Sequence, residues 1–308
     1  MKLVFFGTPD FAVPSLETLV RSRHEVAAVV TQPDRPKGRG RKTVASPVKR
    51  LAEEHNLVVL QPEKASALDS VQRLQTIAPD LMVVVAYGEI LKPQLLEVPE
   101  RGAVNLHASL LPRYRGSSPI QAAILNGDEV TGVTTILMDE GMDTGDILGQ
   151  AEVSVDEDDT AGTLHDKLAR VGAEVLLETV DRIESGTAAP VPQDHGLATY
   201  TKKLTKEDGI IDWNATTERL HNFVRAMNPW PVAHVRDGGL RIWTTSVPGE
   251  EKERADPGTV IQADENGLLV TTLDGAIRIE QLQVAGGKPM SATEFLRGHG
   301  LQEGERFD

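Results

Sequence analysis

Short apolar runs and amphipathic stretches alternate through the first half of the chain. Five runs are almost entirely apolar, as is typical of strands buried on both faces of a sheet: residues 2–6, 25–31, 57–60, 81–86 and 103–107. Stretches that favour helices lie between several of them, among them residues 10–21, which Asp10 is expected to cap. This order predicts an α/β fold with a Rossmann-like, mostly parallel sheet and helices on both faces.

The pattern changes after a long helix predicted over residues 160–185. Residues 190–208 are mostly polar and aperiodic, which predicts a connector. A helix is expected over residues 212–227, and the strands beyond it are short and separated by tight-turn signals at Asn266-Gly267 and Asp274-Gly275. We therefore predict a catalytic domain over residues 1–189, a connector, and over residues 209–308 a smaller antiparallel β-barrel or sandwich.

Composition excludes several classes of protein. The 308 residues include no Cys, so disulfides, thiolate nucleophiles, iron–sulfur clusters and Cys-ligated zinc are excluded. The apolar run near the N-terminus is too short for a signal peptide or a membrane span. We expect a cytoplasmic protein that does not interact with membranes.

Charge is unevenly distributed along the chain. The net charge of −14 opposes nonspecific binding of nucleic acid over the whole surface. Residues 32–45 nevertheless form a predicted irregular, exposed loop with five cations, namely Arg35, Lys37, Arg39, Arg41 and Lys42. Composition alone leaves two interpretations open, a solvated loop or a local site for an anionic partner.

Asn105 and His107 are the first candidates for chemistry. They lie two residues apart at the end of a predicted strand, so their side chains point to the same face. Open α/β sheets bind ligands at this edge. Asn can donate a hydrogen bond to an oxyanion, and His can carry a proton near neutral pH. The alternative is a buried polar pair whose partners are backbone groups.

An acidic turn over residues 139–146 contains the third candidate, Asp143. Several acids beside a His could suggest a metal, but the spacing fits neither an EF-hand nor His-Glu-x-x-His, so we predict no metal. One carboxylate could instead orient the imidazole. The glycine pattern of dinucleotide sites and the Walker A lysine are both missing.

These motifs resemble one known family. The run Asn-x-His-x-Ser-Leu-Leu-Pro-x-Tyr-Arg-Gly over residues 105–116, with Asp143-Thr144-Gly145, is similar to the formyltransferases that use 10-formyltetrahydrofolate. Further similar segments lie at residues 7–11, 31–40, 83–88 and 228–231, so the resemblance covers nearly the whole chain in the same order. The basic loop and the C-terminal domain point to the branch that acts on tRNA.

The resemblance implies a role for each matching position. Asn105, His107 and Asp143 match the catalytic residues, and Ser109, Leu110, Leu111 and Pro112 match the folate-binding segment. Tyr87 and Gly88 end a buried strand, where they either line the folate pocket or only turn the chain. The basic loop, with Arg39 at its centre, matches an insertion that reaches the acceptor end of tRNA. The C-terminal domain matches an oligonucleotide-binding (OB) fold that contacts tRNA.

The implied reaction is transfer of the formyl group from 10-formyltetrahydrofolate to the α-amine of methionyl-initiator tRNA, by a monomeric enzyme. An amine nucleophile supplied by the substrate is consistent with a chain that lacks Cys and a Gly-x-Ser-x-Gly motif. Alternatives are a formyltransferase for a small amine (a purine precursor or an amino sugar), a formyltetrahydrofolate hydrolase and a noncatalytic RNA-binding protein.

Two features of the C-terminal part leave its tRNA contacts open. Residues 209–308 hold ten basic and fifteen acidic residues, although a tRNA-binding domain should present a basic face. Trp230, between two prolines, is either a core anchor or an exposed platform for a nucleotide base. We expect it in the core.

Overall fold

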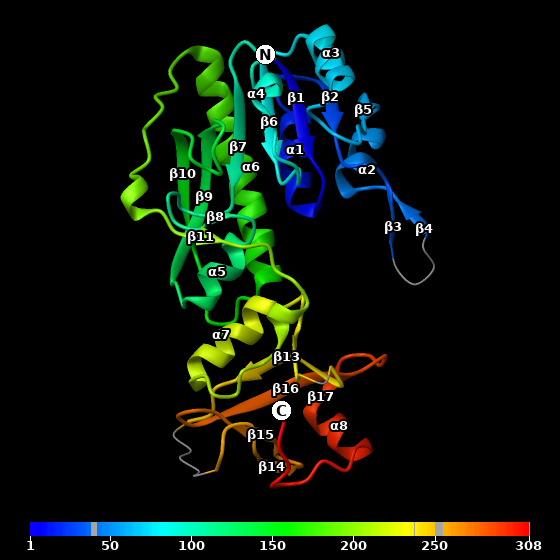
Figure 1. The fold of residues 1–308 in the computed structure, drawn as a ribbon, viewed down its shortest axis with the longest axis vertical. Helices are drawn as coiled ribbons and strands as arrows, with labels where there is room; N and C mark the ends of the chain where they lie inside the picture. Colours follow the sequence, from blue (N-terminus) through cyan, green and yellow to red (C-terminus); the bar gives the residue numbers. More distant parts are fainter. Residues whose placement is uncertain (38–41, 237, 250–254, 308) are drawn as a thin grey trace. The chain divides into compact units, whose positions relative to one another are not determined.

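The computed structural model describes residues 1–37, 42–236, 238–249 and 255–307. The chain forms two compact units (Figure 1). The first comprises Met1–Pro119, Val130–Ser154 and His165–Thr201, and the second comprises Ile120–Glu129, Val155–Leu164 and Lys202–Asp308. Within the described residues, no helix is both long and apolar enough to span a membrane.

The first unit contains a seven-stranded sheet in the order β10–β9–β7–β6–β1–β2–β5. Its parallel strands are β1 (Lys2–Gly7), β2 (Glu25–Val30), β5 (Val59–Leu60), β6 (Leu81–Val85) and β7 (Ala103–His107). β9 (Val130–Leu137) pairs antiparallel with β7, and β10 (Ile147–Ser154) pairs antiparallel with β9. The mostly parallel sheet that was predicted is confirmed.

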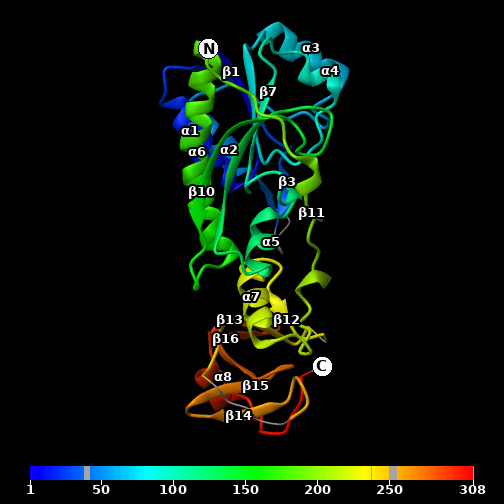
Figure 2. The ribbon, with the colours of Figure 1, turned by 90° about the vertical axis from the view of Figure 1, so that its left-hand side faces the viewer.

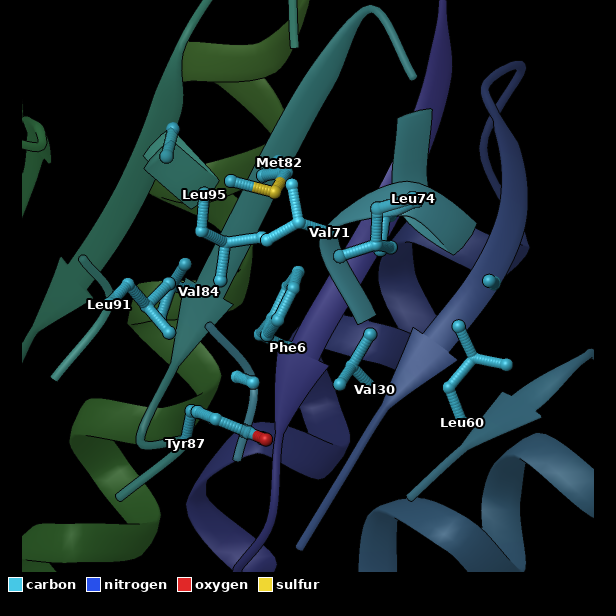
Figure 3. Close-up of a cluster of buried hydrophobic side chains, with 14 residues drawn as sticks. Phe6, Val30, Leu60, Val71, Leu74, Met82, Val84, Tyr87, Leu91 and Leu95 are labelled. Atoms are coloured by element: carbon cyan, nitrogen blue, oxygen red, sulfur yellow. The ribbon is translucent and has the colours of Figure 1, made fainter. Parts of the chain in front are cut away.

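Helices cover both faces of this sheet. Figure 2 shows α1 (Val13–Val20) and α6 (Ala161–Ser185) on one side, and α3 (Leu68–Ile77) and α4 (Pro93–Leu96) on the other. Successive side chains of a strand point to opposite faces of the sheet, so a strand that is apolar at every position makes both faces apolar. Phe6, Met82 and Val84 join Leu74 and Leu95 in one buried cluster (Figure 3). Burial of each such side chain contributes about 1.5–3 kcal/mol.

A side-chain cap marks the start of some helices but not of others. The α2 helix (Pro47–Glu54) begins as expected, because the Ser46 hydroxyl accepts a hydrogen bond from the Lys49 N–H at 3.0 Å. Asp10, by contrast, does not cap a helix. It opens a 3₁₀ turn, and α1 begins only at Val13, with a proline in its first turn.

The basic segment contains a short hairpin. Its arms β3 (Arg35–Lys37) and β4 (Lys42–Val44) pair antiparallel, with Arg35 opposite Val44. The irregular loop expected over residues 32–45 is therefore wrong for these six positions, because three-residue arms are too short to show a period in sequence. Arg39 and Arg41 lie outside the described residues.

The expected connector is partly built into the first unit. β11 (Tyr200–Thr201) pairs parallel with β8 (Arg115–Gly116), and Val191 forms a bridge with Ile147. Val191 thus lies beside the start of β10, and residues 199–201 lie along the segment that follows β7. The domain limits at 189 and 209 stay a prediction.

The second unit is built mainly of antiparallel strands. Its sheet has the order β12–β13–β16–β15–β14, and β17 pairs with β16. The strands are β12 (Ala233–His234), β13 (Leu240–Ser246), β14 (Val260–Asp264), β15 (Gly267–Thr271), β16 (Ala276–Val284) and β17 (Met290–Ser291). This confirms the C-terminal β domain and both predicted turns.

Two helices of this unit depart from expectation. α7 (Thr217–Met227) starts five residues later than predicted, where the Thr216 hydroxyl accepts a hydrogen bond from the Arg219 N–H. α8 (Ala292–Gly298) was not expected, although Ser291 and Glu294 form the capping box that marks its start. Trp230 is 50% exposed, so the expected core position is wrong.

Candidate active site

β7 positions the first two candidate residues. It lies between β6 and β9, and its alternate residues face opposite sides of the sheet. Leu106 faces α6, where Gly172 leaves room for its side chain. Asn105 and His107 therefore share the other face, at the carboxyl end of the strand, as expected.

A backbone carbonyl determines which nitrogen of His107 can exchange a proton. Nε2 of His107 lies 2.9 Å from the carbonyl oxygen of Tyr114. Because a carbonyl oxygen only accepts hydrogen bonds, Nε2 must carry a hydrogen atom and donate the hydrogen bond. Nδ1 faces the Asp143 Oδ2 at 3.6 Å. Nδ1, beside a carboxylate, is therefore the ring nitrogen that remains available for proton exchange.

Asp143 is held on the turn between β9 and β10. Its φ is 54°, a left-handed conformation that Asp tolerates better than most residues. Its Oδ2 accepts a hydrogen bond from the Gly116 N–H at 2.8 Å. Oδ1 has no hydrogen-bond partner in the part of the chain that the structure describes. The carboxylate thus has one oxygen that is held in place and one that is left to accept a further hydrogen bond.

Asn105 differs from an ordinary buried amide. It is half-buried, and its side chain makes no hydrogen bond to any described residue. The sequence left open that both side chains are buried and bonded to backbone groups. This is true of His107 Nε2 but not of Asn105. Its amide N–H groups are available to an oxygen bound in front of β7.

The predicted folate-binding segment is held largely by its own polar groups. Ser109 is buried, and its hydroxyl donates to the Arg113 carbonyl at 2.6 Å. The Leu111 N–H donates to the Thr134 hydroxyl at 3.1 Å, and its side chain is buried. Leu110 and Pro112 remain partly exposed. The first pair shapes the loop, and the second pair is accessible to a ligand.

Tyr87 and Gly88 lie differently from each other. The Tyr87 ring packs edge-on against Phe6, with 5.3 Å between ring centroids, and is 2% exposed (Figure 3). Burial raises the pKa of its hydroxyl to about 12. Gly88 is exposed, with φ 89° and open space beside its Cα. Only Gly88 offers surface, so a ligand contact of Tyr87 is expected only through its backbone.

The backbone conformation of Gly116 requires a glycine, and this requirement can be tested. With φ at 104°, it adopts a conformation that L-residues rarely take, and a Cβ here would overlap the Thr201 carbonyl oxygen. Gly116→Ala should move the N–H that holds Asp143 and lower kcat about tenfold. Gly186→Ala, at φ 71° in open space, is the matched control. Steady-state kinetics of both variants test this, and equal activity would contradict it.

A cluster with metal-like spacing does occur elsewhere among the described residues. It consists of His24, Asp181 and Glu184. The Met1 ammonium donates to Glu184 at 2.6 Å, and Arg23 pairs with both carboxylates. These contacts lower the pKa of Glu184, chiefly through the hydrogen bond from the ammonium. The cluster is thus an ion-pair network already neutralised by cations.

The base of the basic hairpin is anchored by Asp34. One of its oxygens accepts from the Lys49 ammonium at 2.6 Å, and the other accepts from the Gln61 amide at 2.7 Å. These hydrogen bonds, that of Lys49 foremost, lower the pKa of the Asp34 carboxyl. Arg35 is exposed just beyond this anchor. The backbones of Lys37 and Lys42 pair across the hairpin.

Sequence reasoning assigned no role to two groups that hold the site. These are the Tyr114 carbonyl, which orients His107, and the Gly116 N–H, which orients Asp143. Both belong to the motif over residues 105–116. A backbone group leaves no trace in sequence except through a glycine that the conformation requires.

The chain is similar in sequence to known formyltransferases along most of its length. Residues 1–180 match the formyl transferase family, and residues 203–300 match the formyl transferase C-terminal domain. The methionyl-tRNA formyltransferase of Acetivibrio thermocellus is 49% identical over 307 residues, which cover 99% of each chain. That of Clostridioides difficile is 45% identical, again over 99% of each chain.

Solved structures support the fold. An N-formyltransferase from Helicobacter canadensis, in complex with folinic acid and dTDP-3-aminofucose, superposes with a TM-score of 0.68 at 21% identity. The match covers 91% of this chain and 98% of that one. Phosphoribosylglycinamide formyltransferase from Bacillus halodurans has a TM-score of 0.52 at 29% identity and covers 60% of this chain and 96% of its own. Together with the full-length relatives, these matches show that the chain belongs to the formyltransferase family, in the group of methionyl-tRNA formyltransferases.

Proposed function

We propose that this protein transfers the formyl group of 10-formyltetrahydrofolate to the α-amine of methionyl-initiator tRNA. The observation that carries the proposal is the His107–Asp143 pair, whose Nδ1 and Oδ2 lie 3.6 Å apart on the same side of the sheet as the Asn105 amide, which has no hydrogen-bond partner among the described residues. Relatives of the same length and up to 49% identity bear the name of this activity. We propose no metal, because neutral or cationic side chains and a carboxylate suffice for acyl transfer between nitrogens.

The reaction needs alignment and proton movement. The amine attacks the formyl carbon, the carbonyl electrons move to oxygen, and the bond to the folate nitrogen then breaks. A free α-amine has a pKa of about 7.7–8.0, so much of it is already neutral near pH 7.5. Asn105 would donate to the oxyanion. The proton lost by the amine would pass by way of His107 Nδ1 to the departing folate nitrogen, and the Asp143 carboxylate would help by favouring the charged imidazole.

The folate would be held at the same edge of the sheet. Leu110, Pro112 and Gly88 are the exposed members of the predicted folate-binding set, whereas Ser109 and Leu111 support the loop from within. Folate ligands in two structural relatives, folinic acid in one and tetrahydrofolic acid in another, are consistent with this proposal.

A direct assay tests the function. The chain is mixed with 10-formyltetrahydrofolate and methionyl-initiator tRNA, and formylmethionyl-tRNA is measured with unacylated tRNA as the control. Product formation supports the proposal. Folate consumption without tRNA would favour the hydrolase, and consumption only with a small amine would favour the small-amine formyltransferase. Tight tRNA binding without any turnover would favour the noncatalytic protein.

The basic hairpin is proposed to dock the tRNA. Arg39→Ala should raise the KM for methionyl-tRNA about tenfold and leave the KM for folate within about twofold, since each lost phosphate contact weakens binding electrostatically. The effect should shrink at high salt. Arg170→Ala, an exposed position on α6, is the matched control. Equal changes in both KM values would contradict a docking role.

A further inference from the structure

Arg115 is a buried cation with an unusual set of partners. It is 1% exposed, and no carboxylate pairs with it among the described residues. Its Nη2 and Nε donate to the Gln193 Oε1 at 2.6 and 3.2 Å. Nη2 also lies 3.0 Å from His195 Nδ1, which must accept because a guanidinium only donates. At this depth Arg115 cannot touch a substrate, so its role must pass through its neighbours.

Gln193 connects Arg115 to the turn that carries Asp143. Its amide nitrogen donates to the Asp143 carbonyl at 2.9 Å and to the Gly145 carbonyl at 2.7 Å. Gln193 is 6% exposed, and its oxygen and both its amide hydrogens are engaged. The partners also determine the orientation of the amide, because only its nitrogen can face two carbonyls.

Together these contacts close a ring around Asp143. Arg115 holds Gln193, Gln193 holds the Asp143 backbone, and the Asp143 carboxylate accepts from Gly116, the residue next to Arg115. β11 adds a second attachment, since the Arg115 N–H donates to the Thr199 carbonyl at 2.9 Å. The left-handed Asp143 is therefore held from the backbone side and the carboxylate side at once.

We propose that Gln193 is a positioning residue for Asp143, oriented by the buried Arg115. This inference rests on the proposed function, since it assigns Asp143 to proton transfer. The segment that looks like a connector in sequence would thus complete the active site of formyl transfer. A displacement of about 1 Å of a catalytic group can cost about 10²-fold in rate.

The substitution Gln193→Glu separates positioning from simple packing. One carboxylate oxygen can still pair with Arg115, and that contact becomes an ion pair. The other oxygen replaces the amide nitrogen and faces the two carbonyl oxygens, so it repels the turn instead of holding it. The segment therefore stays attached while Asp143 loses its support.

The test compares Gln193→Glu with Gln72→Glu, which makes the same chemical change on the exposed face of α3. We expect Gln193→Glu to lower kcat at least about thirtyfold, with both KM values within about threefold and a melting temperature lowered by no more than about 5 °C. In an Asp143→Asn background, the same substitution should cost less than about threefold, because its effect passes through Asp143.

Other outcomes would overturn the inference. These are a kcat close to that of the wild type, a rise in the folate KM with kcat retained, or an undiminished loss in the Asp143→Asn background. If Gln193→Glu does not fold, Gln193→Met takes its place in the same cycle. A wild-type chain that forms no formylmethionyl-tRNA would refute the proposed function itself. An active wild type with a fully active variant would refute only the role of Gln193.

Discussion

Replacing His107 with alanine is expected to lower kcat for formyl transfer by a factor of about 10²–10⁴, the range for loss of a proton-transfer group. Nε2 is committed to the Tyr114 carbonyl, so Nδ1 is the ring nitrogen left for proton transfer in the proposed mechanism, and Asp143 Oδ2 lies 3.6 Å from it. Neither neighbour can replace the imidazole, because the carbonyl cannot carry a proton and the carboxylate is a weaker base. Single-turnover formation of formylmethionyl-tRNA measures the chemical step.

The control for this experiment is His55→Ala, at an exposed position after α2. It should retain full activity. His107→Ala should keep both KM values within a few-fold, because the ring is nearly buried and contributes little contact area to a substrate. If kcat of His107→Ala stayed within threefold of the wild type, His107 would have no part in proton transfer.

Asn105→Ala is expected to lower kcat about 10²–10³-fold, the range for loss of one donor to a developing oxyanion. The side chain has no hydrogen-bond partner among the described residues, so its removal should leave the fold intact. The loss should appear in kcat and kcat/KM equally, because the charge on the oxygen exists only in the transition state.

Asn105→Asp sharpens this test. It keeps the size of the side chain and replaces the donor with a negative charge, which should repel the oxyanion and cost at least as much activity as alanine. Thermal unfolding of both variants controls for stability. A mutant whose KM for folate rises while kcat is kept would show that Asn105 binds the ground state instead.

Local patterns were sufficient to predict most elements of the fold. The apolar runs at β1, β2, β6 and β7 predict strands within one residue of their limits, since burial on both faces leaves a continuous signal. The short β3–β4 hairpin was missed because its three-residue arms carry no period. The α8 helix was missed although its capping box was present in the sequence.

The environment of individual side chains was harder to predict than the positions of helices and strands. Trp230 is half-exposed where a core position was expected, and Tyr87 packs in the core where a pocket contact was considered. An aromatic side chain suits both environments, because its ring is apolar and its polar group can remain wet. The sequence alone does not show which residues pack against such a ring and shield it from solvent.

For the active site, the sequence by itself determined that Asn105 and His107 share one face at the end of a strand, because a strand has a period of two. It also determined, through the resemblance, that Asp143 belongs with them. Only the tertiary structure decided which nitrogen of His107 is committed and that Arg115 and Gln193 lie behind Asp143. These contacts join residues up to 78 positions apart, and two of the three end on backbone carbonyls. Carbonyls are identical at every position, so no local pattern could reveal their partners.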